Sequence, residues 1–146
     1  MKIIIGSDHA AFKVKEGLKA YLTSLGHKVT DAGTASESPC DYPDIAEKVA
    51  RAVVSGEGER GILLDGTGIG MAMAANRIPG SLAATVHDRV TAEMSRKHTN
   101  ANIFCAGTWV LPVGEIQNCL QVWLETRFEG GRHDKRIAKI LKLDKK

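Results

Sequence analysis

The residues best suited to bind an anion lie between Asp65 and Gly70, where glycine occupies every second position, at Gly66, Gly68 and Gly70. Three glycines let the backbone turn sharply, and a helix that begins directly behind them points its unpaired N–H groups at an anion. The spacing predicts a phosphate or oxyanion cradle, and a tight strand-to-helix turn without a ligand is the alternative. A dinucleotide site is the weaker interpretation, because Met71 replaces the third glycine of G-x-G-x-x-G and the motif follows the third strand.

Acid, imidazole and guanidinium groups provide three further candidates. Asp8 and His9 follow the first apolar run and suit proton transfer or hydrogen bonds to a sugar hydroxyl or a phosphate. His98 ends a segment of helical period, where the helix dipole alone also favours a histidine. Arg132 and Arg136 are four residues apart, so a helix places both guanidinium groups on one face, which suits a phosphate. A solvated basic C-terminus is the alternative for this pair.

Composition and spacing exclude several classes of function. The histidines and cysteines lack the spacing of zinc ligands, and Cys40, Cys105 and Cys119 are expected to be free thiols. The formal net charge of +3 comes from scattered basic residues, which argues against nucleic-acid binding. No apolar segment is as long as a signal peptide or a membrane span. We therefore expect a cytoplasmic protein with no metal site and no nucleic-acid or membrane partner.

Short β-branched runs alternate with longer segments of helical period, which is typical of parallel strands joined by crossover helices. The 146 residues suit one domain of the α/β class. Strands are expected at residues 2–7, 27–32, 61–64, 81–86 and 101–106. Helices are expected at residues 14–25, 43–53, 71–76, 88–97, 116–124 and 137–141. Ligands of open parallel sheets collect where strands end, which favours the residues from Asp8, from Asp65, from His87 and around Gly107.

Four motifs together resemble the ribose-5-phosphate isomerase B family, which includes the subunits of galactose-6-phosphate isomerase and the allose-6-phosphate isomerases. The resemblance extends nearly from end to end, and its order and spacing are specific. The motifs are Gly6-Ser7-Asp8-His9-Ala10-Ala11-Phe12, Asp41-Tyr42-Pro43-Asp44, Gly66-Thr67-Gly68-Ile69-Gly70 with Ala74-Ala75-Asn76, and Phe128-Glu129-Gly130-Gly131-Arg132-His133.

The resemblance implies a three-layer α/β/α domain, Rossmann-like, with a five-stranded parallel sheet. It implies a homodimer or homotetramer whose active sites are completed by a neighbouring subunit, with residues 128–146 contributing phosphate ligands and possible subunit contacts. A hetero-oligomer is also open, and no metal or organic cofactor is implied. By this resemblance His98, with Asp8 beside it, assists ring opening, and His9, Arg132 and Arg136 hold the phosphate. The amides from Thr67 through Gly68 and Ile69 to Gly70 stabilise the enediolate, with Thr67 among the catalytic residues. Gly66 contributes to substrate binding, and Thr99 faces the substrate.

The sequence departs from the family pattern where the catalytic base is expected. Most members have cysteine at the position of Asp65, and one branch uses glutamate at the position of Met71. Asp65 is thus the ionisable side chain that remains, and burial and loop amides would shift its pKa in opposite directions. Thr99 replaces a usual asparagine, and Trp109 replaces an arginine of many members.

Two hypotheses follow from these departures. The first is an isomerase of four- to six-carbon sugar phosphates that uses Asp65 as its base. The second is a homologue that binds sugar phosphates with weak or no turnover, or one subunit of a hetero-oligomer.

Overall fold

A five-stranded parallel sheet forms the centre of the computed structural model, which describes residues 1–144. The strands are β1 (Lys2–Ser7), β2 (Lys28–Asp31), β3 (Arg60–Asp65), β4 (Ala83–Thr85) and β5 (Ile103–Gly107), in the order β2-β1-β3-β5-β4. All neighbouring pairs are parallel. Each predicted strand is confirmed to within two residues at either end.

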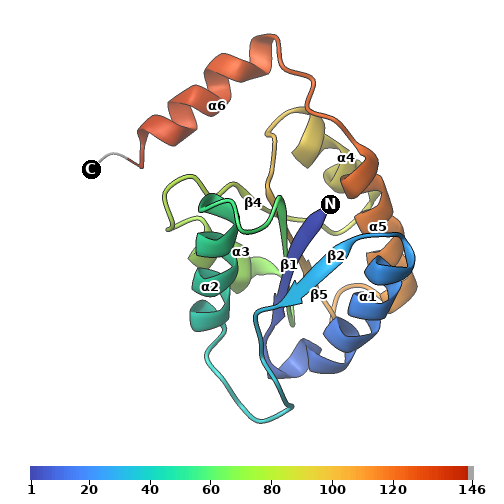
Figure 1. Ribbon diagram of the computed structural model, residues 1–146. Helices are drawn as coiled ribbons and strands as arrows, with labels where there is room; N and C mark the ends of the chain where they lie inside the picture. Colours follow the sequence, from blue (N-terminus) through green and yellow to red (C-terminus); the bar gives the residue numbers. More distant parts are fainter. Residues whose placement is uncertain (145–146) are drawn as a thin grey trace.

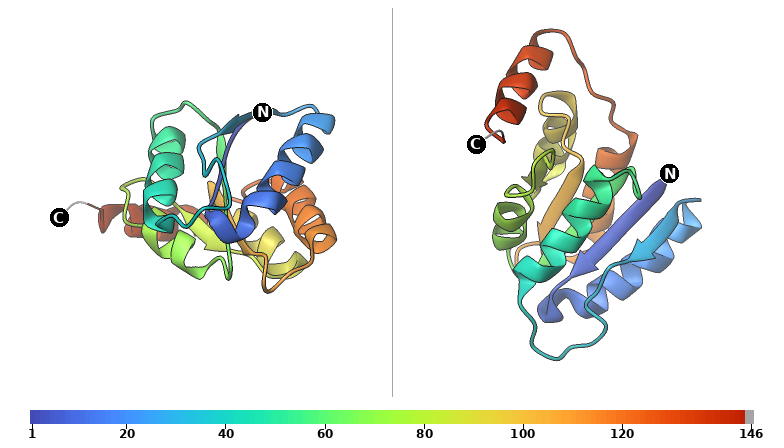
Figure 2. Two further views of the ribbon diagram at one scale, coloured as in Figure 1. Left: turned by 90° about the horizontal axis from the view of Figure 1, so that it is seen from below. Right: turned by 60° about the vertical axis from the view of Figure 1, so that its left-hand side comes forward.

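Helices cover both faces of this sheet, so the three-layer α/β/α architecture is confirmed (Figure 1). One face is covered by α1 (Phe12–Ser24), α4 (Arg89–Lys97) and α5 (Val113–Glu125), and the other by α2 (Tyr42–Val54) and α3 (Ile69–Ala75). A short 3-10 helix, η1 (His9–Ala11), precedes α1. Figure 2 shows the two helical layers on opposite sides of the strands.

The apolar strands alternate their side chains between these two layers, as the period of a strand requires. Ile3 and Ile5 pack in the core with α1 and α5, whereas Ile4 packs in the core with α2. The central strands β1, β3 and β5 are buried on both faces, which explains why they read as continuous apolar runs. This packing holds the ends of β1 and β3, and the polar residues that follow them, in fixed positions.

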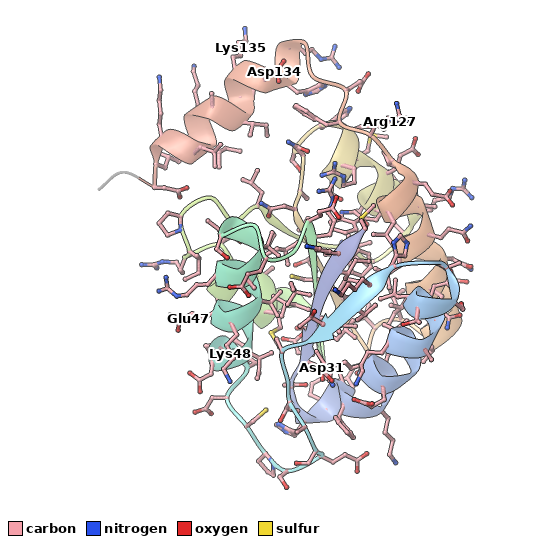
Figure 3. All side chains as sticks on the ribbon, in the orientation of Figure 1. Asp31, Glu47, Lys48, Arg127, Asp134 and Lys135 are labelled. Carbon is pink, nitrogen blue, oxygen red and sulfur yellow. The ribbon has the colours of Figure 1, made fainter. Side chains whose placement is uncertain are left out.

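The last helix, α6 (Arg132–Lys142), lies outside the three layers, near the end of the sheet where β1 begins (Figures 1 and 2). Ile137 is its buried apolar residue, while Ile140 and Leu141 are partly exposed to solvent. Lys135 points away from the sheet (Figure 3). Of the predicted C-terminal segment 128–146, the last two residues lie outside the described part of the chain.

Among residues 1–144, no helix is both long enough and apolar enough to cross a membrane.

Candidate functional site

A pocket of about 400 Å³ opens where β1 and β3 end. The side chains of Asp8 and Asp65 reach it from these two strands, and the glycine loop forms part of its wall. Asp8 and Asp65 therefore lie together at the carboxyl ends of the strands, where the sequence predicts that polar residues gather. The complete lining is Asp8, Tyr42, Asp65, Gly66, Thr67, Ile69, Gly70, Met73 and Trp109.

The glycine loop turns directly from β3 into α3, as the sequence predicts, although α3 begins two residues earlier than expected. Gly68 precedes the helix with a φ of 80°, in the left-handed region that favours glycine. Its carbonyl accepts a hydrogen bond from the Thr85 hydroxyl at 3.1 Å, which links the loop to β4. The Thr67 hydroxyl accepts from the Ile69 amide at 3.2 Å. Hydrogen bonds within the loop and from β4 thus hold the loop in one conformation.

The carboxylate of Asp65 occupies part of the predicted anion cradle. Its Oδ1 accepts from the Gly68 amide at 2.5 Å and its Oδ2 from the Met71 amide at 3.3 Å. The side chain is buried, with 5% of the residue exposed. Burial raises the pKa of Asp65 above its ordinary value; the hydrogen bonds from Gly68 and Met71 lower it, and the neighbouring Asp8 carboxylate raises it. The net direction is upward, so burial prevails over the loop amides.

Asp8 and His9 follow the end of β1, and Asp8 lines the same pocket as Asp65. Asp8 Oδ1 accepts from the Ala11 amide at 3.2 Å, which caps η1 and holds the side chain in place. His9 Nδ1 accepts from the Cys40 amide at 3.2 Å, and the Cys40 thiol lies 3.9 Å from the same nitrogen. The loop before α2 therefore orients the imidazole of His9.

Two aromatic rings flank the glycine loop, and sequence reasoning did not place them there together. A Cβ added at Gly66 would lie 2.6 Å from the Trp109 ring, and one added at Gly70 would lie 2.7 Å from the Tyr42 ring. Each ring packs directly on the glycine backbone, so a Cβ at either position would push the ring away. In the sequence Tyr42 stands out only as part of the motif Asp41-Tyr42-Pro43-Asp44, since no short-range signal reveals which backbone a ring will contact.

The remaining predicted site residues lie at the opposite end of the strands, near the edge of the sheet where the strands begin. The helix α4 begins after the carboxyl end of β4 and runs back, so His98 and Thr99 lie where the strands begin. Arg132 and Arg136 are on α6, which lies near the same edge (Figure 1). Both arginines are exposed and, being one helical turn apart, share a face of α6. Within one chain, Asp8 and His98 therefore lie at opposite ends of the strands.

The elements at this second edge are tied together around His98. Its ring stacks on that of His133, with centroids 4.4 Å apart, and its Nε2 lies 3.7 Å from Glu129 Oε2. The Glu129 amide donates to the Lys97 carbonyl at 3.1 Å. The Thr99 hydroxyl donates to the Ser95 carbonyl at 2.6 Å, so it serves the end of α4. Glu129 and His133 were not among the predicted site residues, because their proximity to His98 depends on the path of the chain between α5 and α6.

Comparison with known proteins identifies the family. Residues 3–140 match the family model described as Ribose/Galactose Isomerase. The chain belongs to this family. Its members are sugar-phosphate isomerases, which are intramolecular oxidoreductases that interconvert aldoses and ketoses.

Three relatives illustrate the match along the whole chain. The structure of ribose-5-phosphate isomerase B from Clostridium thermocellum is 43% identical, with a TM-score of 0.98 and coverage of 99% of this chain and 98% of that one. Ribose-5-phosphate isomerase B of Escherichia coli K12 is 37% identical over 145 residues, which are 99% of this chain and 97% of the relative. D-erythrulose-4-phosphate isomerase of Pectobacterium atrosepticum is 39% identical over 142 residues, covering 96% and 93%.

Proposed function

We propose that this member of the family interconverts an aldose phosphate and a ketose phosphate by opening the sugar ring and forming an enediolate, with Asp65 as the base. The substrate is ribose 5-phosphate and ribulose 5-phosphate, or a related sugar phosphate of four to six carbons. Relatives that act on five-carbon and four-carbon sugars support this range. The proposed reaction requires no metal or organic cofactor, and the proposed site of action is the cytoplasm.

The observation that carries this proposal is the buried carboxylate of Asp65 at the wall of the pocket. A general base works best when its pKa is close to the working pH, and the pKa of Asp65 is raised toward that range. By the family resemblance, Asp65 stands at the position of the cysteine found in most members. A glutamate performs the same class of proton transfer in triosephosphate isomerase. A carboxylate is therefore chemically competent for the step.

The proposal also requires two copies of the chain for each active site. β3, which has six residues, spans roughly 20 Å, and this exceeds the length of an open-chain pentose phosphate. One chain therefore cannot bring Asp65 and His98 to the same sugar. In a homodimer or homotetramer, the edge of one copy that bears His98, Arg132 and Arg136 would face the pocket of another, and the arginines would hold the phosphate.

Mixing two inactive variants tests this sharing of residues. In a dimer with two shared sites, Asp65→Asn and His98→Gln chains would form hybrids with one intact site. After random exchange of subunits, about a quarter of the wild-type activity is expected to return, because half of the dimers are hybrids and each has one working site. Each variant alone gives the background, and exchange is followed by mass spectrometry. If hybrids form without any regain of activity, the two residues do not act across the interface.

Exchange of solvent deuterium tests the role of Asp65. The wild type is expected to incorporate deuterium from heavy water at carbon 1 or 2 of a four-, five- or six-carbon sugar phosphate. Asp65→Asn should lower the turnover by at least about a hundredfold. Asp44→Asn, which removes an exposed carboxylate at the start of α2, is the matched control. Full activity of Asp65→Asn, or no exchange with any of the substrates, would contradict the proposal.

The pH profile provides a second readout of the same residue. The base acts in its ionised form, so kcat/KM should rise with pH as Asp65 loses its proton. Because the pKa of Asp65 is raised, the rise should occur at higher pH than for an ordinary exposed aspartate. The Asp44→Asn control should keep this limb of the profile unchanged.

A second candidate function is supported by the hydrogen bonds of Asp65. Both carboxylate oxygens accept loop amides, so the side chain also has the contacts of a structural cap for α3. On this alternative, the protein binds sugar phosphates with weak turnover, or acts as one subunit of a hetero-oligomer. Phosphosugar binding by calorimetry without deuterium exchange, or turnover only after a second homologue is added, would favour it.

A further inference from the structure

We infer that His98, Glu129 and His133 form a binding site for a zinc ion. One ligand atom from each of the three residues lies within 4.8 Å of the others. Two imidazoles and one carboxylate, with a position left for water, are a ligand set that zinc uses in other enzymes. The consequence for activity rests on the function proposed above, whereas the binding of the ion does not.

The geometry of the three side chains approaches that of a bound ion. The Nε2 atoms of His98 and His133 lie 3.7 and 3.9 Å from the same atom, Glu129 Oε2. Ligand atoms around a tetrahedral zinc ion lie roughly 3.4 Å apart, given bonds near 2.0 to 2.1 Å. The two rings are stacked with an angle of 14° between their planes, so their in-plane lone pairs run nearly parallel. Binding therefore requires the rings to tilt apart until both Nε2 lone pairs point at the ion.

The backbone holds these three side chains together without a metal. His98 ends α4, and the Lys97 carbonyl before it accepts the hydrogen bond from the Glu129 amide. The His133 amide donates to the Gly130 carbonyl at 3.1 Å, in the first turn of α6. The site therefore joins the end of α4 to the start of α6, which are distant in sequence. Zinc would add a further link between them.

Electrostatics favour imidazole ligands but limit the affinity. His133 is buried, and an imidazole binds a metal in its neutral form. The carboxylate of Glu129 provides the one negative charge among the ligands. The nearby arginine side chains oppose a cation, so binding should be weaker than at a structural zinc site. The side chains of His98 and Glu129 are 41% and 58% exposed, which leaves an approach for the ion and for water.

The expected effect of the ion is reversible inhibition. Zinc bound to His98 Nε2 occupies the lone pair that the imidazole would use in ring opening. A phosphosugar and the ion would then compete for the same edge of the chain.

Cobalt is the direct probe for this site, because tetrahedral Co²⁺ absorbs visible light much more strongly than the hydrated ion. The full chain titrated with Co²⁺ should develop these bands, and Zn²⁺ should remove them. Glu129→Gln should weaken Co²⁺ binding at least tenfold, and His133→Gln should abolish the bands. Lys135→Gln, on the outer side of α6 (Figure 3), is the matched control and should bind as the wild type does. Glu129 is exposed, so its variant should still fold.

The possible results separate this site from the others. Cys40 and His9 are an alternative pair of metal ligands, because the Cys40 thiol lies close to the His9 imidazole. Loss of the bands in Cys40→Ser would overturn the inference. Absence of the bands in the wild type, or bands insensitive to both Glu129→Gln and His133→Gln, would also overturn it. Co²⁺ bands in a chain without isomerase activity would refute only the proposed function. In an active chain, Zn²⁺ should inhibit and a chelator should restore the rate, and Glu129→Gln should need at least tenfold more Zn²⁺ for the same fractional inhibition.

Discussion

The contact between Trp109 and the glycine loop can be measured as a coupling energy. A Cβ at Gly66 would lie 2.6 to 2.7 Å from three atoms of the indole, whereas carbon atoms normally approach to about 3.5 to 4.0 Å. The ring must therefore move by about 1 Å in Gly66→Ala. Overpacking costs about 1 to 3 kcal/mol. We expect about 1 kcal/mol, because Trp109 is 77% exposed and can swing into solvent.

Removing the ring should remove this cost. Gly66 does not have a φ in the left-handed region, so alanine can adopt its backbone conformation. In a Trp109→Ala background, Gly66→Ala should therefore change the free energy of unfolding by less than about 0.5 kcal/mol. The resulting coupling energy is about 1 kcal/mol, which corresponds to a difference of roughly 3 °C in Tm for a chain of this size.

Urea unfolding of the four chains at one protein concentration measures the coupling. Val110→Ala, which truncates the exposed neighbour of Trp109, is the matched control background, and there Gly66→Ala should keep its full cost. A coupling energy below about 0.3 kcal/mol would be within normal additivity. It would refute the contact, and with it the view that Trp109 forms a wall of the pocket.

Two further predictions concern stability away from the aromatic rings. Gly107→Ala should destabilise the protein by about 3 kcal/mol or more, because its Cβ would lie 2.4 Å from the backbone of the glycine loop. Gly114 lies in α5 with open space where a Cβ would be, so Gly114→Ala should instead stabilise the protein by about 0.5 to 1 kcal/mol in urea unfolding. Lys15→Met should cost about 2 kcal/mol, because it removes a buried partner of Asp31 at 2.5 Å, while Lys19, at 2.8 Å, remains. Lys19→Met, the more exposed partner, should cost less than about 1 kcal/mol in the same assay, and equal losses for the two lysines would contradict the role of burial.

The sheet was predictable because its central strands are buried on both faces. Ile3, Ile4 and Ile5 read as a strand since each side chain enters one of the two cores. β4 was the least well predicted strand, because it is a short edge strand with only partly buried residues. A run of apolar residues predicts a strand well where the strand is buried, and it predicts the ends of a strand poorly where burial is incomplete.

The candidate site was predictable only where it is local in sequence. The glycine loop and its approach to α3 follow from adjacent residues. The net direction of the pKa shift of Asp65 could not be predicted in this way, because the burial of its side chain depends on the packing of segments that are distant in sequence. The stacking of His98 on His133 and the placing of Tyr42 against Gly70 are contacts between distant segments. The family resemblance supplied the idea of a shared site, and the positions of the two groups of residues at opposite edges supply its geometrical reason.

The amides that bind Asp65 are compatible with a catalytic role for this residue. Before proton transfer, the negative charge would lie on the carboxylate, which accepts from Gly68 and Met71. After Asp65 takes the proton, the charge would lie on the enediolate, and the neutral carboxyl would accept the same amides less strongly. The net charge of the pocket would be the same before and after the step, because the proton transfer moves the negative charge from Asp65 to the substrate. The same loop can therefore stabilise the base before the step and the intermediate after it, so occupation of these amides by Asp65 is not by itself an argument for a purely structural role.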